Sequence, residues 1–180
     1  MLIAGIVTPA WSGDMVISHF AQGAVTLDGW QWQGFADTVM GGRSTLESPG
    51  LVNTEYGPAL RLAGQVVTRG GGFIQVRLQN QGIFNADAFR GVEVELRARR
   101  AGSYYVFART RDNSFPWSYY GAPLQLSQEK QVIQILWSDF QGQATLRRTI
   151  RPHLLTSLAL VAAYEDFQAD LEIFRVGLFQ

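Results

Sequence analysis

Val92-Glu-Val-Glu-Leu-Arg-Ala-Arg99 is the stretch that decides the fold class of this 180-residue chain. Apolar and charged residues alternate strictly along it, which is the pattern of a β-strand that buries one face. The charged residues from Glu93 to Arg99 share the opposite face. Because they carry both signs, we expect cross-strand ion pairs on a solvated surface.

A second stretch, Phe73-Ile-Gln-Val-Arg-Leu78, has the same period of two residues. Its apolar set, from Ile74 to Leu78, belongs in the core. Successive side chains of a strand point to opposite faces, so this placement turns Gln75 and Arg77 outward or into a groove.

Short runs of this kind continue along the chain, separated by turns that contain Gly, Pro or Asn. The expected strands are Met15–Phe20, Ala24–Leu27, Trp30–Phe35, Ser44–Glu47, Ala59–Leu62, Phe73–Leu78, Val92–Arg99, Tyr104–Thr110, Val132–Trp137, Ser157–Tyr164 and Leu171–Phe179. Helical periodicity does not extend over several turns in any window. The pattern is typical of an all-β sandwich or barrel.

Length and composition favour one soluble domain. We expect residues 1–14 to be a loosely ordered lead-in and residues 15–180 to form a single β-sandwich. Lys and Arg number 15 and Asp and Glu number 15, which gives no electrostatic reason to expect nucleic acid as a partner. The chain has no cysteine and no apolar run long enough to span a bilayer, so a cytoplasmic location is expected.

Asp37-Thr-Val-Met-Gly-Gly-Arg-Ser44 is the most distinctive motif. Gly41 and Gly42 permit a tight turn, and we expect buried side chains beside it. Two interpretations are open. Asp37 and Arg43 could form an ion pair that holds a structural loop, or the loop could be a recognition site on a rigid scaffold.

Signatures of catalysis and of cofactor binding are missing. The end of the motif has Arg43 where a phosphate-binding loop needs Lys, and no Gly-x-Ser-x-Gly elbow occurs. His19 and His153 lie far apart in the sequence without metal-ligand spacing. A hydrolase that used Asp37 would lack a second carboxylate. We therefore predict no catalytic residue, no cofactor and no metal site.

Binding residues are suggested by arginines and loop aromatics. Arg43, Arg77 and Arg109 are candidates to line one surface together with the aromatic residues Trp117, Tyr119 and Tyr120. Aromatic side chains in a polar loop can stack on sugars, bases or peptide side chains. Alternatively, the aromatics of this loop plug the end of the sandwich.

Two of these motifs carry a resemblance to a known family. Trp32 followed by Asp37–Ser44, and then Gly71-Gly-Phe-Ile-Gln-Val-Arg77, resemble the complex I intermediate-associated protein 30 family. The order of the later strands is also similar, so the likeness covers about residues 15–179. The resemblance implies a galactose-binding-like jelly-roll sandwich. It also implies a chaperone-like, protein-binding role in the assembly of respiratory complex I or a related membrane complex, without catalysis.

The sequence therefore predicts a non-enzymatic binding domain whose partner is a protein, with a glycan as the alternative ligand. The expected partner- or ligand-binding residues are Asp37, Arg43, Ser44, Arg77, Arg109, Trp117 and Tyr119. The expected structural residues are Gly41, Gly42, Gly71, Gly72 and Phe73. The chain is not expected to span a membrane.

Overall fold

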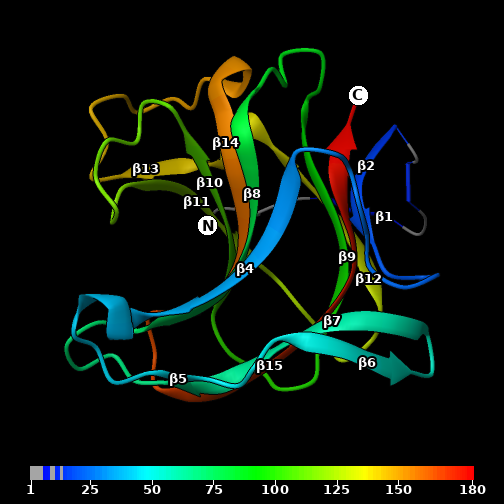
Figure 1. Ribbon diagram of the computed structural model, residues 1–180, viewed down its shortest axis with the longest axis vertical. Coiled ribbons are helices and arrows are strands. Elements are labelled where there is room, and N and C mark those ends of the chain that lie inside the picture. The colour runs from blue at the N-terminus through cyan, green and yellow to red at the C-terminus, as the bar shows by residue number, and fades with distance from the viewer. Residues whose placement is uncertain (1–5, 9–10, 13) are drawn as a thin grey trace.

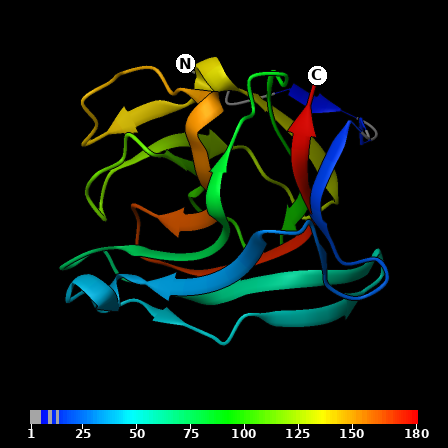
Figure 2. The same cartoon turned by 45° about the horizontal axis from the view of Figure 1, so that its top comes forward.

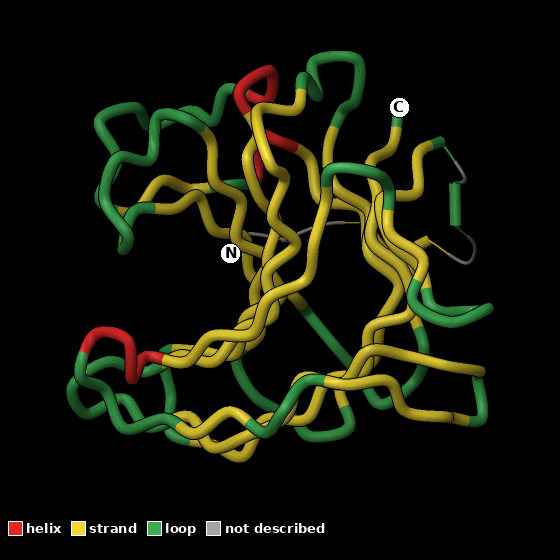
Figure 3. The backbone as a smooth tube through the Cα atoms, in the orientation of Figure 1, coloured by secondary structure: helices red, strands yellow, loops and turns green. Residues whose placement is uncertain are grey.

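A computed structural model describes residues 6–8, 11–12 and 14–180. Two antiparallel sheets pack face to face and enclose the core between them (Figure 1). Helical structure in the described residues is limited to short 3-10 turns, drawn in red in Figure 3. The all-β class predicted from the alternating stretches is confirmed.

The larger sheet contains nine strands among the described residues. Its main path is β1 (Ile6–Thr8), β12 (Gln131–Leu136), β9 (Gly91–Ala98), β15 (Phe167–Phe179), β2 (Met15–His19) and β3 (Val25–Thr26). Strand β7 (Gly57–Val66) also pairs with β15, and it carries β5 (Thr45–Leu46) and β6 (Gly50–Thr54). The alternating stretch Val92–Arg99 forms most of β9, which lies between two antiparallel neighbours.

The smaller sheet contains six described strands and carries the candidate site. Its order is β13 (Gln141–Gln143), β11 (Tyr119–Leu124), β10 (Tyr104–Thr110), β14 (Leu155–Ala163), β8 (Phe73–Phe84) and β4 (Trp30–Ala36). The 3-10 turns are η1 (Asp37–Met40), η2 (Trp137–Asp139) and η3 (Pro152–Leu154). Strand β4 lies beside β5, so the edges of the two sheets meet there (Figures 1 and 2).

The core follows the alternation of the sequence. Val92, Val94 and Leu96 of β9 are fully buried, and Ile74 and Leu78 of β8 face them across the sandwich core. Burying one such side chain contributes roughly 1.5–3 kcal/mol. The opposite face of β8 is therefore turned away from the core, as predicted for Gln75 and Arg77.

The charged face of β9 differs from the prediction, because it is buried rather than solvated. Glu93 is 0% exposed, Glu95 5% and Arg97 9%. Ion pairs accommodate the charges of Glu95 and Arg97, and hydrogen bonds from Ser12 and Gln134 accommodate that of Glu93. Glu95 pairs with Arg175 of β15 and with Lys130, and Arg97 donates to Glu55 (2.6 Å) and Glu172 (2.5 Å). The ring of Tyr56 covers Arg97, with its centroid 5.1 Å from the guanidinium carbon.

The expected lead-in is partly described. Ile6–Thr8 pairs with β12, and both the backbone N–H and the hydroxyl of Ser12 donate to Glu93. Residues 1–5, 9–10 and 13, also part of that prediction, lie outside the described residues. Within the described ranges, no helix has the length and apolar character needed to cross a membrane.

Candidate binding cleft

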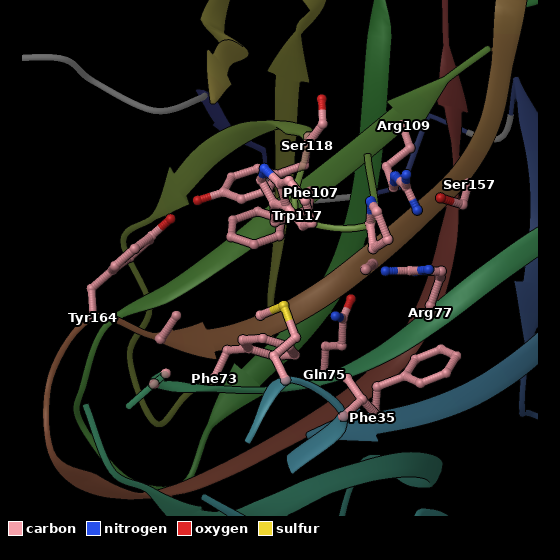
Figure 4. Close-up of a pocket in the computed structure, with 18 residues that line it drawn as sticks. Phe35, Phe73, Gln75, Arg77, Phe107, Arg109, Trp117, Ser118, Ser157 and Tyr164 are labelled. Atoms are coloured by element: carbon pink, nitrogen blue, oxygen red, sulfur yellow. The ribbon is translucent and has the colours of Figure 1, made fainter. Parts of the chain in front are cut away.

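A cleft of about 760 Å³ opens on the face of the six-stranded sheet that points away from the core (Figure 4). Three parts of the chain enclose it: the sheet itself, the turn η1 together with the Gly71–Gly72 loop before β8, and the loop before β11. The lining residues are Phe35, Val39, Met40, Gly71, Gly72, Phe73, Gln75, Arg77, Phe107, Arg109, Pro116, Trp117, Ser118, Tyr119, Ser157, Ala159, Ala163 and Tyr164.

Small side chains on β14 form the floor of the cleft. Ala159 lies opposite Arg77 of β8 on one side and opposite Phe107 of β10 on the other. Ser157 lies opposite Arg109. Cross-strand neighbours on one face have Cβ atoms about 4.5–5.5 Å apart, so short residues between longer ones leave a hollow. The depth of the cleft thus follows from the residues of the central strand.

Stacked aromatic rings form one wall. The rings of Phe107 and Tyr119 stack with centroids 3.8 Å apart and planes 11° apart. Tyr105 contacts both Phe107 and Tyr164, the latter edge-on at 5.2 Å. These contacts fix the rings without a polar partner, because aromatic pairs favour such offset and edge-on arrangements.

The aromatic loop before β11 does not plug the end of the sandwich. Phe115 and Trp117 stack on each other at 5.2 Å and are 53% and 54% exposed. Trp117 lines the mouth of the cleft (Figure 4). Of the two interpretations of this loop, the structure favours a surface that is available for contact.

Arg77 and Arg109 lie on the same side of the cleft, beside Ser157 (Figure 4). Arg77 is held over the ring of Phe35, with its guanidinium carbon 5.0 Å from the centroid. Arg109 donates from Nη2 to the carbonyl oxygens of Phe115 (2.9 Å) and Asn113 (3.2 Å). Neither arginine forms an ion pair with any carboxylate in the described residues.

The surroundings of the two guanidinium groups disfavour their charge. Burial, followed by repulsion from Arg109, lowers the pKa of Arg77 to about 10. Burial also lowers the pKa of Arg109. Both shifts have the direction expected for cations that have lost water without gaining an anion.

Gln75 adds an unsatisfied polar group to this region. Its side chain is 6% exposed, and its Oε1 atom has no hydrogen-bond partner in the described residues. Leaving a buried acceptor unpaired costs about 1–3 kcal/mol. Gln75 lies opposite Phe35 in the sheet and lines the cleft, so a ligand donor could reach it.

Asp37 holds the two glycine loops together from behind the cleft. Its carboxylate is 0% exposed and accepts hydrogen bonds from the backbone N–H (2.9 Å) and hydroxyl (2.7 Å) of Ser44. The backbone N–H of Gly72 donates to it as well, at 2.5 Å. A Cβ atom at Gly42 would overlap the Asp37 carboxyl carbon, and one at Gly71 would lie 2.7 Å from Asp37 Cβ. The glycines therefore make room for a buried carboxylate.

Two expectations for this motif are wrong. The described structure contains no ion pair between Asp37 and Arg43; Arg43 is exposed and does not line the cleft. The reason is that backbone and hydroxyl donors already occupy the Asp37 oxygens. The apolar residues Val39 and Met40 are not buried but 70% and 47% exposed, because η1 turns them toward the mouth of the cleft.

The predicted site residues thus separate into groups. Arg77, Arg109, Trp117 and Tyr119 line the cleft, together with Gly71, Gly72 and Phe73. Asp37 and Ser44 are buried in the loops that shape it, and Gly41 and Gly42 form the turn between them. Sequence reasoning missed several lining residues: Phe35, Val39, Met40, Phe107, Ser157, Ala159 and Tyr164. Strand parity relative to Arg109 would have indicated Phe107, just as parity along β8 indicated Gln75 beside Arg77.

The fold defines a β-sandwich domain with a cleft on one sheet, and its family can be named. The family model for complex I intermediate-associated protein 30 (CIA30) matches residues 19–168. The chain therefore belongs to this family, which supports an association with complex I assembly in general. A comparison with curated proteins gives no match.

Several solved structures with the same fold are carbohydrate-binding modules. The family 11 module of the cellulosomal cellulase Lic26A-Cel5E of Clostridium thermocellum aligns with a TM-score of 0.69 at 10% identity, over 92% of this chain and 94% of that one. The family 11 module in complex with a β-1,3-1,4-mixed-linked tetrasaccharide gives 0.68 at 10% identity, over 93% and 97%. A family 29 module gives 0.50 at 9% identity, over 91% and 86%. At these identities the likeness shows the fold: a galactose-binding-like jelly-roll sandwich.

Proposed function

We propose that this protein is a non-enzymatic, chaperone-like binding domain. In this proposal, the cleft on the six-stranded sheet holds a segment of a partner protein during assembly of respiratory complex I or a related membrane complex. Membership of the family supports the assembly role in general. The cleft supplies the place where a partner would bind.

The exposed apolar rim of the cleft is the observation that carries this proposal. Val39, Met40, Trp117 and Tyr164 are 70%, 47%, 54% and 59% exposed and all line it. Contiguous apolar side chains around a hollow mark interaction sites on soluble proteins. Met is typical of surfaces that adapt to peptide side chains, and the aliphatic Val39 offers no flat face to a sugar ring.

The composition of the lining supports a binding role rather than catalysis. The residues that line the cleft include no Asp, Glu, His, Cys or Lys. A general acid or base must lie within hydrogen-bond reach of the reacting atoms. The single carboxylate of the glycine motif, that of Asp37, is buried and accepts hydrogen bonds from Ser44 and Gly72.

Affinity capture from membranes of the source organism tests this function. The wild-type protein should retain subunits of a respiratory or other membrane complex, identified by mass spectrometry. A double variant, Val39→Ser with Met40→Ser, should lose them, since both side chains are exposed and their loss should leave the fold intact.

Leu146→Ser is the matched control, because Leu146 is 99% exposed and lies outside the cleft. It should retain the same subunits as the wild type. Equal recovery with the rim variant, or recovery of no membrane-complex subunit, would count against the proposal.

A glycan is the second candidate ligand, and one observation favours it. Trp117 presents an exposed ring at the mouth of the cleft, and such rings stack on sugars. A glycan array probed with the wild type and with Trp117→Ala would decide. A signal that disappears in the variant would support carbohydrate binding, and an array without signal would exclude it for the glycans displayed.

A further inference from the structure

The arginines of the cleft differ from the other partly buried arginines of this protein. Those elsewhere are neutralised by carboxylates: Arg61 by Glu47 and Asp170, Arg97 by Glu55 and Glu172, Arg151 by Asp112, and Arg175 by Glu95. Arg77 and Arg109 have no such partner in the described residues, and no acidic residue lines the cleft. A half-buried cation is normally paired, so this pair points to an anion supplied from outside.

The guanidinium groups of Arg77 and Arg109 are held in positions suited to binding a carboxylate. Arg77 is stacked on Phe35, and Arg109 is bonded by one nitrogen to the loop carbonyls of Asn113 and Phe115. These contacts restrain both guanidinium planes before any ligand arrives. Arginine donors match the two oxygens of a carboxylate, and such charge-assisted hydrogen bonds are about twice as strong as neutral ones.

We propose that Arg77 and Arg109 bind the side-chain carboxylate of a Glu or Asp in the partner segment, with bulky apolar residues on either side of that acid. This proposal rests on the proposed function, whose partner it specifies. The flanking apolar side chains would contact Met40 and Trp117 at the rim. Gln75 Oε1, buried without a donor, would accept a backbone N–H of the segment.

The lining favours an acidic peptide over an acidic sugar. Recognition of a sugar relies on flat aromatic faces, whereas Val39 and Met40 add exposed aliphatic and thioether surface on the side of η1. Phe107 and Tyr119 already stack on each other, so their facing surfaces are unavailable for a ring. Binding of an acidic sugar is therefore one of the results that the following experiment distinguishes.

A defined peptide array provides the test. It displays capped tripeptides in which Trp, Phe, Leu or Met flank a central Glu, Asp, Gln or Lys, and it includes a digalacturonate spot. We expect peptides with a central Glu or Asp to bind at least about tenfold more tightly than peptides with a central Gln. A tenfold difference in affinity corresponds to about 1.4 kcal/mol. Solution titration of the best peptide and its Gln counterpart should give the same ratio.

The variant Arg77→Gln with Arg109→Gln should reduce this preference to less than twofold while keeping the weak binding of the neutral peptides. Arg148→Gln is the control, since Arg148 is exposed outside the cleft, and it should behave as the wild type. Thermal melting of each protein verifies that it is folded.

Other results separate this inference from the function on which it rests. Equal binding of Glu and Gln peptides would overturn the carboxylate subsite and leave the protein-binding function standing. Absence of binding to every peptide would overturn the subsite and also count against the function. If digalacturonate binds in a way that depends on the two arginines and no peptide binds, the proposal of a peptide ligand would be overturned. The cleft would then be assigned to acidic glycans.

Discussion

The carboxylate of Asp37 positions side chains that it does not touch. It is buried, and its hydrogen bonds to Ser44 and Gly72 join the loop after η1 to the loop before β8. With both loops held, η1 presents Val39 and Met40 at the mouth of the cleft. The motif therefore acts through backbone position, which explains why it is conspicuous in the sequence yet contributes no charged group to the lining of the cleft.

Gly42→Val tests this role at the level of one residue. Since a Cβ atom at Gly42 would overlap the Asp37 carboxyl group, the carboxylate or the turn must move. We expect a loss of more than about 1 kcal/mol in the free energy of unfolding, measured by thermal or denaturant unfolding. Gly50→Ala is the control, because nothing lies within 4 Å of a Cβ there. An unchanged melting temperature for the valine variant would refute the steric role.

Arg77→Leu should separate stability from binding. The folded-state pKa of Arg77 is lowered to about 10, so below that pH the folded protein holds a cation that its surroundings disfavour. Removing the charge while keeping an apolar stem against Phe35 should leave the melting temperature unchanged or raise stability by up to about 1 kcal/mol. Partner binding should fall. A marked loss of stability would show that Arg77 is part of the scaffold.

At the scale of elements, β9 and β15 carry a network of partly buried ion pairs on the face opposite the core. Glu95 of β9 lies between Arg175 of β15 and Lys130, and Arg97 of β9 lies between Glu172 of β15 and Glu55. Removing one member leaves its partners uncompensated in a place that water reaches poorly. The two strands are thus coupled through charge as well as through their backbone ladder.

This network predicts how stability depends on pH. Burial alone would raise the pKa of Glu95, but hydrogen bonds from Arg175 and Lys130 outweigh it and lower the pKa below its usual 4.5. Hydrogen bonding by Arg97 lowers the pKa of Glu55 in the same way. As the pH falls, Glu95 and Glu55 therefore take up protons in the unfolded state before they do so in the folded state. The stability that these two carboxylates contribute above about pH 4.5 is lost as the pH falls below that value.

Melting curves between pH 7 and pH 3 measure this dependence. The wild type should keep a steady melting temperature down to about pH 5 and lose stability below it. Glu95→Gln should melt lower at pH 7 and show a smaller decrease toward acid, because it has already lost that contribution. Parallel curves for the two proteins would contradict the assignment.

At the scale of the molecule, charge is balanced in number but not in placement. The chain has 15 basic and 15 acidic residues, yet acids surround the arginines of the larger sheet and none lines the cleft. The cleft is therefore a local cationic spot on a neutral protein. Such a spot can orient one anionic group, whereas a polyanion requires an extended basic surface.

An electrophoretic mobility-shift assay with duplex DNA and RNA tests whether the protein binds a polyanion. At about 0.15 M salt, we expect no shift with protein up to about 100 µM, because non-specific binding depends on several phosphate contacts at once. The acidic tripeptides described above should still bind under the same conditions. A nucleic-acid shift that Arg77→Gln abolishes would instead assign the arginines to phosphate.

The β class, the faces of β8 and β9, and the glycine motif could be predicted from the sequence alone, because each depends on a period of two residues or on local backbone geometry. It also indicated Arg77, Arg109, Trp117 and Tyr119, which do line the cleft. The position of β14 between β8 and β10, which puts small residues between the two arginines, became known only from the three-dimensional structure. Sheet order depends on long-range pairing, which a single sequence does not encode locally. For the same reason, burial of the charged face of β9 and exposure of Val39 and Met40 became evident only once their neighbours were in place.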